Sequence, residues 1–236
     1  MPTELTGGFA VFVRFLGHSA FVVELGGRTL VFDAWLQRKS DNVERLVPPA
    51  VDSTAVHKAD LVLVSHEHFD HCSPLDVGDI VARTCAQVVA PSESLAVLGV
   101  PQRNRVTAAV GDSFTVNGVN VEVVEARHPQ SFNPVGFVAS RGGERVYFAG
   151  DTYAFHAMNA IDVDVALLPI GGTYTMDALS AVTAVKQLKA RYVVPMHYDT
   201  FAKISADAED FGKRVRAAVK CEPVVLKPGD GFECNS

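Results

Sequence analysis

The chain has 236 residues and a net charge of −6, and 48% of its residues are hydrophobic and 20% charged. This composition is typical of a globular protein with a large core, so we expect a single domain over residues 1–236. The acidic balance excludes a general attraction to nucleic acid or to anionic membranes, and no stretch approaches the roughly 20 apolar residues of a membrane span.

The four cysteines include no C-x-x-C pair, and the first residues lack the basic and apolar features of a signal peptide. We therefore expect thiols rather than disulfides, a reducing compartment and a cytoplasmic location.

The first half of the chain alternates strand signals with turns. Gly26-Gly27 predicts a hairpin between residues 21–25 and 29–32, because glycine supplies the positive φ angles of a tight turn. Ser73 and Pro74 predict the N-cap and first residue of a helix over residues 74–83, whereas residues 39–53 have no periodicity and predict a loop. We expect strands over residues 11–16, 21–25, 29–32, 61–64 and 87–90, and a short helix over residues 92–98.

The second half repeats this alternation. Asn117-Gly118 predicts one hairpin and Gly142-Gly143 another. We expect strands over residues 113–116, 119–126, 135–140, 145–149, 165–168 and 192–195, and helices over residues 176–188 and 207–219. Hairpins mixed with alternating strands and helices predict a layered α/β architecture with mixed sheets.

The two halves share a weak internal repeat. Phe21-Val22, Gly26-Gly27 and Phe32 recur at one constant offset as Phe137-Val138, Gly142-Gly143 and Phe148. The repeat suggests two similar halves packed face to face, with a site where their strand ends meet. Gly-Gly hairpins are common, so the repeat is supporting evidence only.

The strongest chemical signal is the segment Ser65-His66-Glu67-His68-Phe69-Asp70-His71, which follows the apolar run of residues 61–64. Imidazole suits zinc and similar metals, and a carboxylate adds negative charge for a second cation. Side chains two apart in an extended segment point the same way, so His66 and His68 can hold one ion while Asp70 and His71 face another. A solvated loop would explain poorly why three of the chain's eight histidines lie here.

Three later residues stand in the same context. His128, Asp151 and His197 each come just after an apolar strand, the usual place for sites in sheet proteins. Gly150 allows the backbone to turn sharply before Asp151. The sequence therefore predicts a site for two metal ions.

This pattern resembles the metallo-β-lactamase superfamily, in which His-x-His-x-Asp-His is followed by a separate His, an Asp after Ala-Gly and a His after an apolar strand. The match runs from Gly17-His18-Ser19 to Lys227-Pro228-Gly229. Residues 167–171 and 194–201 are most similar to small cytoplasmic metal-dependent hydrolases related to ascorbate-phosphate lactonases. The resemblance implies a four-layer αββα sandwich, an α/β fold of two similar halves with mixed β-sheets.

By position, the resemblance also implies which residues hold the metals. It assigns the first metal to His66, His68 and His128. It assigns the second metal to Asp70, His71 and His197, with Asp151 as the bridge. The implied cofactors are two divalent ions, most often Zn²⁺, with Mn²⁺ or Fe²⁺ as alternatives.

The mechanism that we expect is hydrolysis by a hydroxide shared between the two cations. Two metals roughly 3.5–4 Å apart lower the pKa of a shared water from about 15.7 towards neutrality. Asp70 would be the catalytic residue, orienting that hydroxide or passing its proton to the leaving group. No serine or cysteine nucleophile is needed, so Ser65 and Cys72 are predicted to pack or to support the ligands.

Four further residues are candidates for substrate contacts. His18 lies between two predicted strands and either contacts substrate or bonds to the backbone. Thr173 and Tyr174 follow Gly171-Gly172 and either bond to substrate or form a structural turn, and Tyr198 lies beside His197.

The leading function is hydrolysis of an ester-type bond in a small molecule, with lactones and phosphodiesters as the two substrate classes. Nucleases of the superfamily share the seven ligands, but the acidic charge and the lack of room for an RNA-binding arm weigh against them. A metal-binding scaffold without turnover is the alternative from another class. We expect no membrane partner, and relatives often form homo-oligomers.

Overall fold

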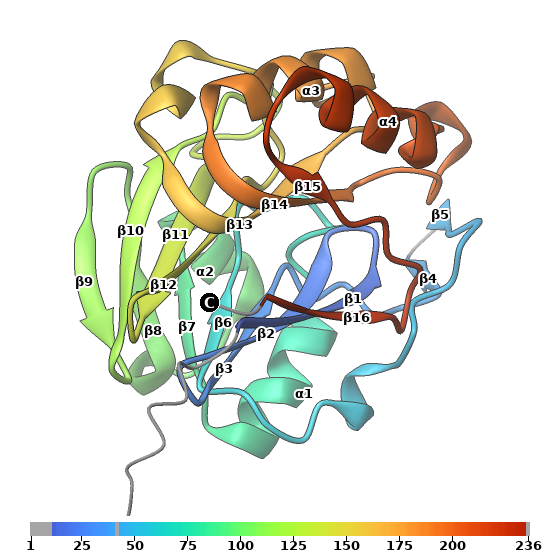
Figure 1. Ribbon diagram of the computed structural model, residues 1–236. Helices are drawn as coiled ribbons and strands as arrows, with labels where there is room; N and C mark the ends of the chain where they lie inside the picture. Colours follow the sequence, from blue (N-terminus) through green and yellow to red (C-terminus); the bar gives the residue numbers. More distant parts are fainter. Residues whose placement is uncertain (1–10, 41–42, 235–236) are drawn as a thin grey trace, which may run out of the picture.

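Two mixed β-sheets of seven strands each pack face to face in the computed structural model, which describes residues 11–40 and 43–234 (Figure 1). Helices α1 (Pro74–Thr84) and α2 (Ser92–Leu98) pack on the outer side of one sheet. Helices α3 (Ala178–Gln187) and α4 (Ala208–Ala218) pack on the outer side of the other. The four layers form the αββα sandwich that the family resemblance implies, and the sheets are mixed, as the sequence pattern predicts.

Both sheets have the same pairing pattern, with three antiparallel pairs on one side and three parallel pairs on the other. The first sheet consists, in spatial order, of β16 (Gly231–Cys234), β1 (Val11–Gly17), β2 (Ala20–Leu25), β3 (Arg28–Phe32), β6 (Leu61–Leu63), β7 (Gln87–Ala90) and β8 (Arg105–Thr107). The second sheet consists of β9 (Ser113–Val116), β10 (Val119–Glu125), β11 (Val135–Arg141), β12 (Glu144–Phe148), β13 (Asp162–Pro169), β14 (Lys189–Met196) and β15 (Glu222–Pro223).

The internal repeat of the sequence corresponds to this shared pattern. Phe21 pairs with Phe32 across β2 and β3, and Phe137 pairs with Phe148 across β11 and β12. The four rings are buried between the sheets, and those of Phe32 and Phe148 stack with centroids 4.8 Å apart. Equivalent positions of the two halves therefore meet in the core, which confirms the face-to-face packing.

Side-chain caps set where the helices begin. The Ser73 hydroxyl accepts a hydrogen bond from the backbone nitrogen of Asp76, as its place before Pro74 predicts. Asp177 caps α3 by accepting from the backbone nitrogen of Ser180. Because a cap has extended backbone, α3 begins at Ala178, two residues later than the apolar spacing predicts.

Several short strands were not predicted, whereas β6, β7 and β9, of three or four residues each, were. The unpredicted ones are β8, β15 and β16, and part of the loop expected over residues 39–53 forms the paired strands β4 (Lys39–Ser40) and β5 (Val43–Glu44), with a 3₁₀ turn at Ser53–Ala55 at its end. Strands of two to four residues are too short to give a periodic signal, and β16 owes its structure to pairing with β1 at the other end of the chain. None of the helices in the described part of the chain has the length and apolar character needed to cross a membrane.

The two halves are joined by backbone hydrogen bonds where their central strands end. The backbone nitrogen of His197, after β14, donates to the carbonyl of His18 in the first half at 2.8 Å. The backbone nitrogen of Val135, at the start of β11, donates to the carbonyl of Ser65, just beyond β6, at 3.0 Å. These bonds fix the loops that follow β1, β6 and β14 against one another, and the candidate site lies among them.

Candidate metal centre

The histidine-rich segment after β6 is folded into a tight turn. The backbone nitrogens of His71 and Cys72 both donate to the carbonyl of His68, at 3.0 and 2.8 Å. The turn lets His66, His68, Asp70 and His71 face the other half of the sandwich, although they are close in sequence. Three groups of potential metal ligands result among the described residues: two are the clusters described below, and the third joins Asp33 to His66 and His71.

The first cluster consists of three imidazole nitrogens. His66 Nε2 lies 3.0 Å from His68 Nδ1, and His128 Nε2 lies 3.2 Å from the same atom. His128 comes from the segment after β10, so the second half of the chain completes the cluster. Its members are those that the resemblance assigns to the first metal.

The second ring nitrogen of each histidine has a hydrogen-bond acceptor of its own. His68 Nε2 lies 3.2 Å from the carbonyl of Gln130, and His128 Nδ1 lies 3.2 Å from the carbonyl of Tyr174. His66 Nδ1 lies 2.9 Å from the hydroxyl of Ser65, which donates its own hydrogen to Asp33 at 2.6 Å. Because carbonyls only accept and the Ser65 hydrogen is already used, the ring proton must sit on these outer nitrogens.

The three converging nitrogens therefore carry lone pairs rather than protons. Nitrogen lone pairs 3.0–3.2 Å apart repel one another unless a cation lies between them. Two nitrogen ligands at about 2.0–2.1 Å from a tetrahedral zinc lie roughly 3.3 Å apart. The spacing and the fixed tautomers both fit a bound metal ion.

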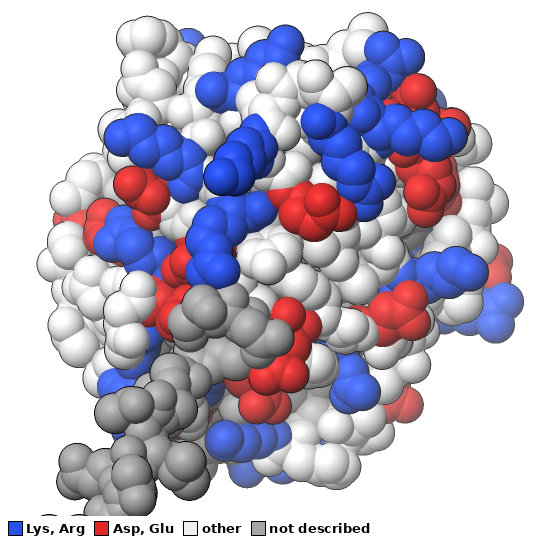
Figure 2. Space-filling model, in the orientation of Figure 1, with Lys and Arg blue, Asp and Glu red and all other residues white. Residues whose placement is uncertain are grey.

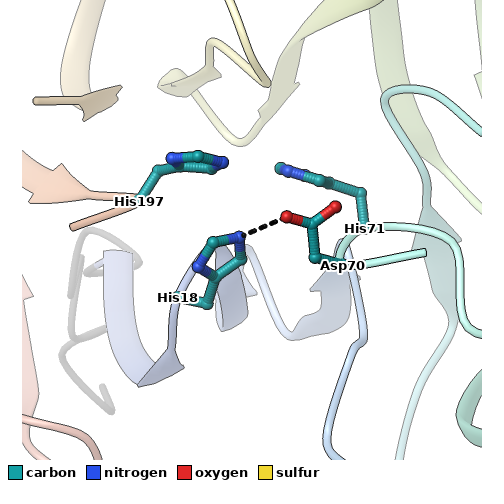
Figure 3. Close-up of side chains that lie close together, drawn as sticks. All are labelled: His18, Asp70, His71 and His197. Atoms are coloured by element: carbon teal, nitrogen blue, oxygen red, sulfur yellow. Dashed lines mark ion pairs between the residues drawn. The ribbon is translucent and has the colours of Figure 1, made fainter. Parts of the chain in front are cut away.

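The second cluster contains His18, Asp70, His71 and His197, whose side chains converge in Figure 3. Asp151 lies between the two clusters. One of its oxygens, Oδ2, is 3.1 Å from His197 Nε2 and 3.8 Å from His128 Nε2, and the other, Oδ1, is 3.3 Å from His71 Nε2. A carboxylate in this position can contact ions in both clusters.

Asp33 is a buried carboxylate that supports both clusters and that the sequence analysis missed. Its oxygens accept hydrogen bonds from the Ser65 backbone nitrogen at 2.7 Å, from the Ser65 hydroxyl at 2.6 Å and from His71 Nδ1 at 2.6 Å. Burial raises the pKa of Asp33, and His71 and Ser65 oppose that rise by favouring the anion. Asp33 follows β3 as Asp151 follows β12, so the position after an apolar strand was the signal that could have found it.

The electrostatics of the two clusters differ. Burial lowers the pKa of His66 well below its usual value and also lowers that of His128, so both rings are neutral. Burial alone would lower the pKa of His71 as well, but the carboxylates of Asp151, Asp33 and Asp70 raise it well above the usual value. Burial opposes ionisation of Asp151 too, yet His197 and His71 hold its pKa well below normal. A strongly anionic pocket of this kind attracts a divalent cation.

His18 contacts Asp70 and is not among the residues that line the cavity. It is 3% exposed, and its Nε2 lies 3.2 Å from Asp70 Oδ2 (Figure 3). Burial lowers the pKa of His18 to about 3, so the neutral ring can donate from Nε2 to the carboxylate. This position favours a role in orienting Asp70 over the predicted substrate contact.

Strained backbone accompanies the site. His18, Asp33 and His197 have φ angles of 60°, 40° and 55°, in the left-handed region that residues with a side chain rarely occupy. Gly150 has a φ of 59°, and a Cβ there would lie 2.7 Å from Ser65 Cβ, so glycine is required before Asp151. Such strain persists only where the surrounding structure fixes it, as it does at the two ligand clusters.

A cavity of about 560 Å³ opens beside the two clusters. Its base includes the side chains of His68, Asp70, His128, Asp151 and His197. Of the four predicted substrate contacts, Tyr174 lines the cavity. Thr173 instead donates to the carbonyl of Lys203 at 2.6 Å, and Tyr198 is half-buried against the hydrophobic core.

Comparison with known proteins agrees with this geometry. A family model described as "Beta-lactamase superfamily domain" matches residues 12–197. The chain is 38% identical over 227 residues to a UPF0173 metal-dependent hydrolase of Pyrobaculum arsenaticum, a match that covers 92% of this chain and 97% of that protein.

Solved structures show the same relationship. Igni18, a metallo hydrolase from Ignicoccus hospitalis, is similar with a TM-score of 0.80 and 32% identity over 97% of this chain and all of that one (100%). The metallo-beta-lactamase fold protein YhfI from Bacillus subtilis has a TM-score of 0.72 at 14% identity, over 95% of this chain and 99% of that one. The latter likeness shows the fold alone.

Proposed function

The chain belongs to the metallo-β-lactamase superfamily and, within it, to the UPF0173 metal-dependent hydrolases, and from this premise we propose that it holds two metal ions and cleaves an ester-type bond in a small molecule. The observation that carries the proposal is the placement of Asp151 between the two ligand clusters. Its Oδ2 and Oδ1 lie 3.1 Å from His197 Nε2 and 3.3 Å from His71 Nε2, and Oδ2 lies 4.0 Å from His66 Nε2.

In this proposal the first ion is held by His66, His68 and His128. The second is held by Asp70, His71 and His197, and Asp151 is shared. The imidazole-rich first cluster favours zinc, whereas the added carboxylates of the second also suit manganese or iron. Zinc in both positions is the composition that we propose.

The chain's own residues prepare the site for hydrolysis. When bound, paired divalent ions supply Lewis acidity and an acidified water at neutral pH. His18 Nε2 lies 3.2 Å from Asp70 Oδ2, a contact that restricts the orientation of the carboxylate where it lines the cavity. Burial alone would raise the pKa of Asp70, but His71 and His18 hold it well below its ordinary value, so the carboxylate is placed to accept a hydrogen bond from the attacking water and to orient it.

The surface charges give no support to a nuclease. In Figure 2, Lys and Arg side chains gather in the upper part of the view, where Figure 1 places the layer of α3 and α4. Several of them are paired with acids. On α4, Arg214 lies 2.5 Å from Asp210, and Arg216 lies 2.7 Å from Glu222. Paired charges of this kind do not form a track for a phosphate backbone.

The test is metal analysis followed by a substrate panel. We expect elemental analysis of the purified protein to find two divalent ions per chain, and we expect turnover of p-nitrophenyl esters or lactones that is lost in Asp151→Ala. Bis-p-nitrophenyl phosphate in the same panel separates a phosphodiesterase from an esterase. Bound metal without turnover on any of these compounds would refute the hydrolase proposal and favour a metal-binding scaffold.

A further inference from the structure

The walls of the cavity differ in character from its base. The base is formed by five of the candidate metal ligands, namely His68, Asp70, His128, Asp151 and His197, and seven other residues complete the lining. These wall residues are Val43, Phe69, Gln130, Tyr174, Phe201, Ala202 and Lys203. Five of the seven have apolar or aromatic side chains, so a molecule that reaches the metal site has to lie against a largely apolar surface.

Two aromatic rings of the wall are held in place from behind. Trp35 is fully buried (0% exposed), and its ring packs edge-on against Phe69 at 5.5 Å between centroids and at a shallow tilt against Phe201 at 5.8 Å. The Phe69 and Phe201 rings lie 6.4 Å apart. We call Phe69, Phe201 and the Trp35 ring behind them the aromatic wall; because these rings pack on one another before a ligand binds, the entropy cost of ordering them on binding is reduced.

The lining of the cavity also leaves aromatic surface exposed to solvent. Phe69 is 42% exposed and Tyr174 is 38% exposed, although both line the cavity. Exposed aromatic surface next to convergent polar groups is the usual composition of a small-molecule site. A ligand with an apolar group would cover that surface and remove it from water.

The charges of the cavity favour a carboxylic ester over a phosphodiester. Among the described wall residues, Lys203 is the one with a cationic side chain. Metal ions can bind the oxygen at the reacting atom of either substrate class, so the distinction depends on the wall, where the further oxygens of a phosphodiester would need several arginines or lysines. One lysine on a largely apolar wall is a poor match for such a group.

We infer that the substrate is a carboxylic ester, lactones included, whose acyl or aryl group lies against Phe69 and Phe201 while its carbonyl faces the metal-ligand side chains. This inference rests on the proposed hydrolase function and names its substrate class. In the reaction, water adds across the ester C–O bond: the acyl carbon gains the hydroxyl, the alcohol oxygen gains the hydrogen, and the acid product ionises. The apolar group stays on the wall throughout.

Binding can be measured without turnover, because Trp35 is the chain's single tryptophan and packs against both rings. We propose titrating the metal-loaded protein with butanoate, hexanoate and octanoate and following Trp35 fluorescence. Each added methylene that reaches the wall should tighten binding about fourfold. Phe69→Ala should weaken octanoate binding about tenfold and butanoate binding far less.

The matched control is Phe132→Ala, because Phe132 is 81% exposed and does not line this cavity. Metal content is measured in every variant, because Phe69 lies between the candidate ligands His68 and Asp70. Phe201→Leu is a second variant of the wall, and it is distant in sequence from those ligands. The same preparations are assayed with p-nitrophenyl butanoate and octanoate and with bis-p-nitrophenyl phosphate.

The outcomes separate the two proposals. Both proposals are supported if affinity rises with chain length, if Phe69→Ala and Phe201→Leu reduce that rise, and if the octanoate ester is turned over faster than the butanoate ester. Ester turnover with binding that is independent of chain length, or equal losses in Phe132→Ala, would overturn the inference and leave the hydrolase. Graded binding without turnover of any ester would support the apolar wall and overturn the hydrolase. Preference for the phosphodiester would overturn the substrate class alone.

Discussion

Asp33 offers the sharpest test of how the second half of the metal centre is built. Its carboxylate accepts three hydrogen bonds, two from Ser65 and one from His71 Nδ1. Asp33→Asn keeps the size of the side chain but replaces one acceptor oxygen with an NH₂ group, which only donates. If the amide oxygen still accepts from the Ser65 backbone nitrogen, the NH₂ group must face the Ser65 hydroxyl and His71 Nδ1.

The consequence falls on the tautomer of His71. To accept from the amide, Nδ1 must lose its proton, and the proton moves to Nε2, the atom 3.3 Å from Asp151 Oδ1. A protonated Nε2 has no lone pair for a metal. If His71 instead keeps its proton on Nδ1, it loses the hydrogen bond to the side chain at position 33, and losing a hydrogen bond to a charged group costs about 1.5–3 kcal/mol. We therefore expect the affinity for one of the two ions to fall about 10–100-fold, the range seen when such supporting carboxylates are replaced.

The assay is the number of ions retained per chain after dialysis against buffers of graded chelator strength. Asp60→Asn is the control, because Asp60 accepts from the Thr29 backbone nitrogen at 2.9 Å and from Arg28 at 2.7 Å in the same half but contacts none of the candidate ligands. Near-UV circular dichroism verifies that each variant is folded. Two ions bound to Asp33→Asn with unchanged affinity would refute the tautomer argument.

Four other predictions follow from the same geometry. Asp151→Ala should lose both ions and all turnover, because one carboxylate faces both clusters; retention of two tightly bound ions would contradict the shared role. Cys72→Ala should keep close to wild-type turnover, since the thiol is buried with a pKa raised to about 12 and contacts the Ser94 carbonyl at 3.7 Å; loss of activity with the metal retained would point to a covalent role. A strong chelator should inactivate the enzyme while far-UV circular dichroism persists, because the core between the sheets does not depend on the metal; unfolding on chelation would refute this. Metal affinity should rise with pH above 6.5, because in the metal-free protein carboxylates hold the pKa of His71 well above that value and an incoming ion must displace the His71 proton. Calorimetry in buffers of different ionisation enthalpy should detect the released proton. If no proton is released on binding, metal and proton do not compete for His71.

The sequence by itself determined the parts of this protein that depend on local chemistry. Gly26-Gly27, Asn117-Gly118 and Gly142-Gly143 specify hairpins because few other residues tolerate the positive φ angles of tight turns. The pattern of histidines and aspartates just after apolar strands predicted all seven candidate ligands, because the residue type determines the metal chemistry and the strand ends determine the location. The repeat that places Phe32 near Phe148 was also visible in the sequence.

Only the tertiary structure decided how those residues are supported and what surrounds them. Asp33 reaches His71 across 38 positions of sequence, and His18 reaches Asp70 from the turn between β1 and β2. The aromatic wall joins Trp35, Phe69 and Phe201 from three separate loops. Hydrogen bonds and cavity walls of this kind arise from pairs of residues far apart in the chain, and their geometry is set by sheet packing. Such packing cannot be predicted from a local pattern of residues.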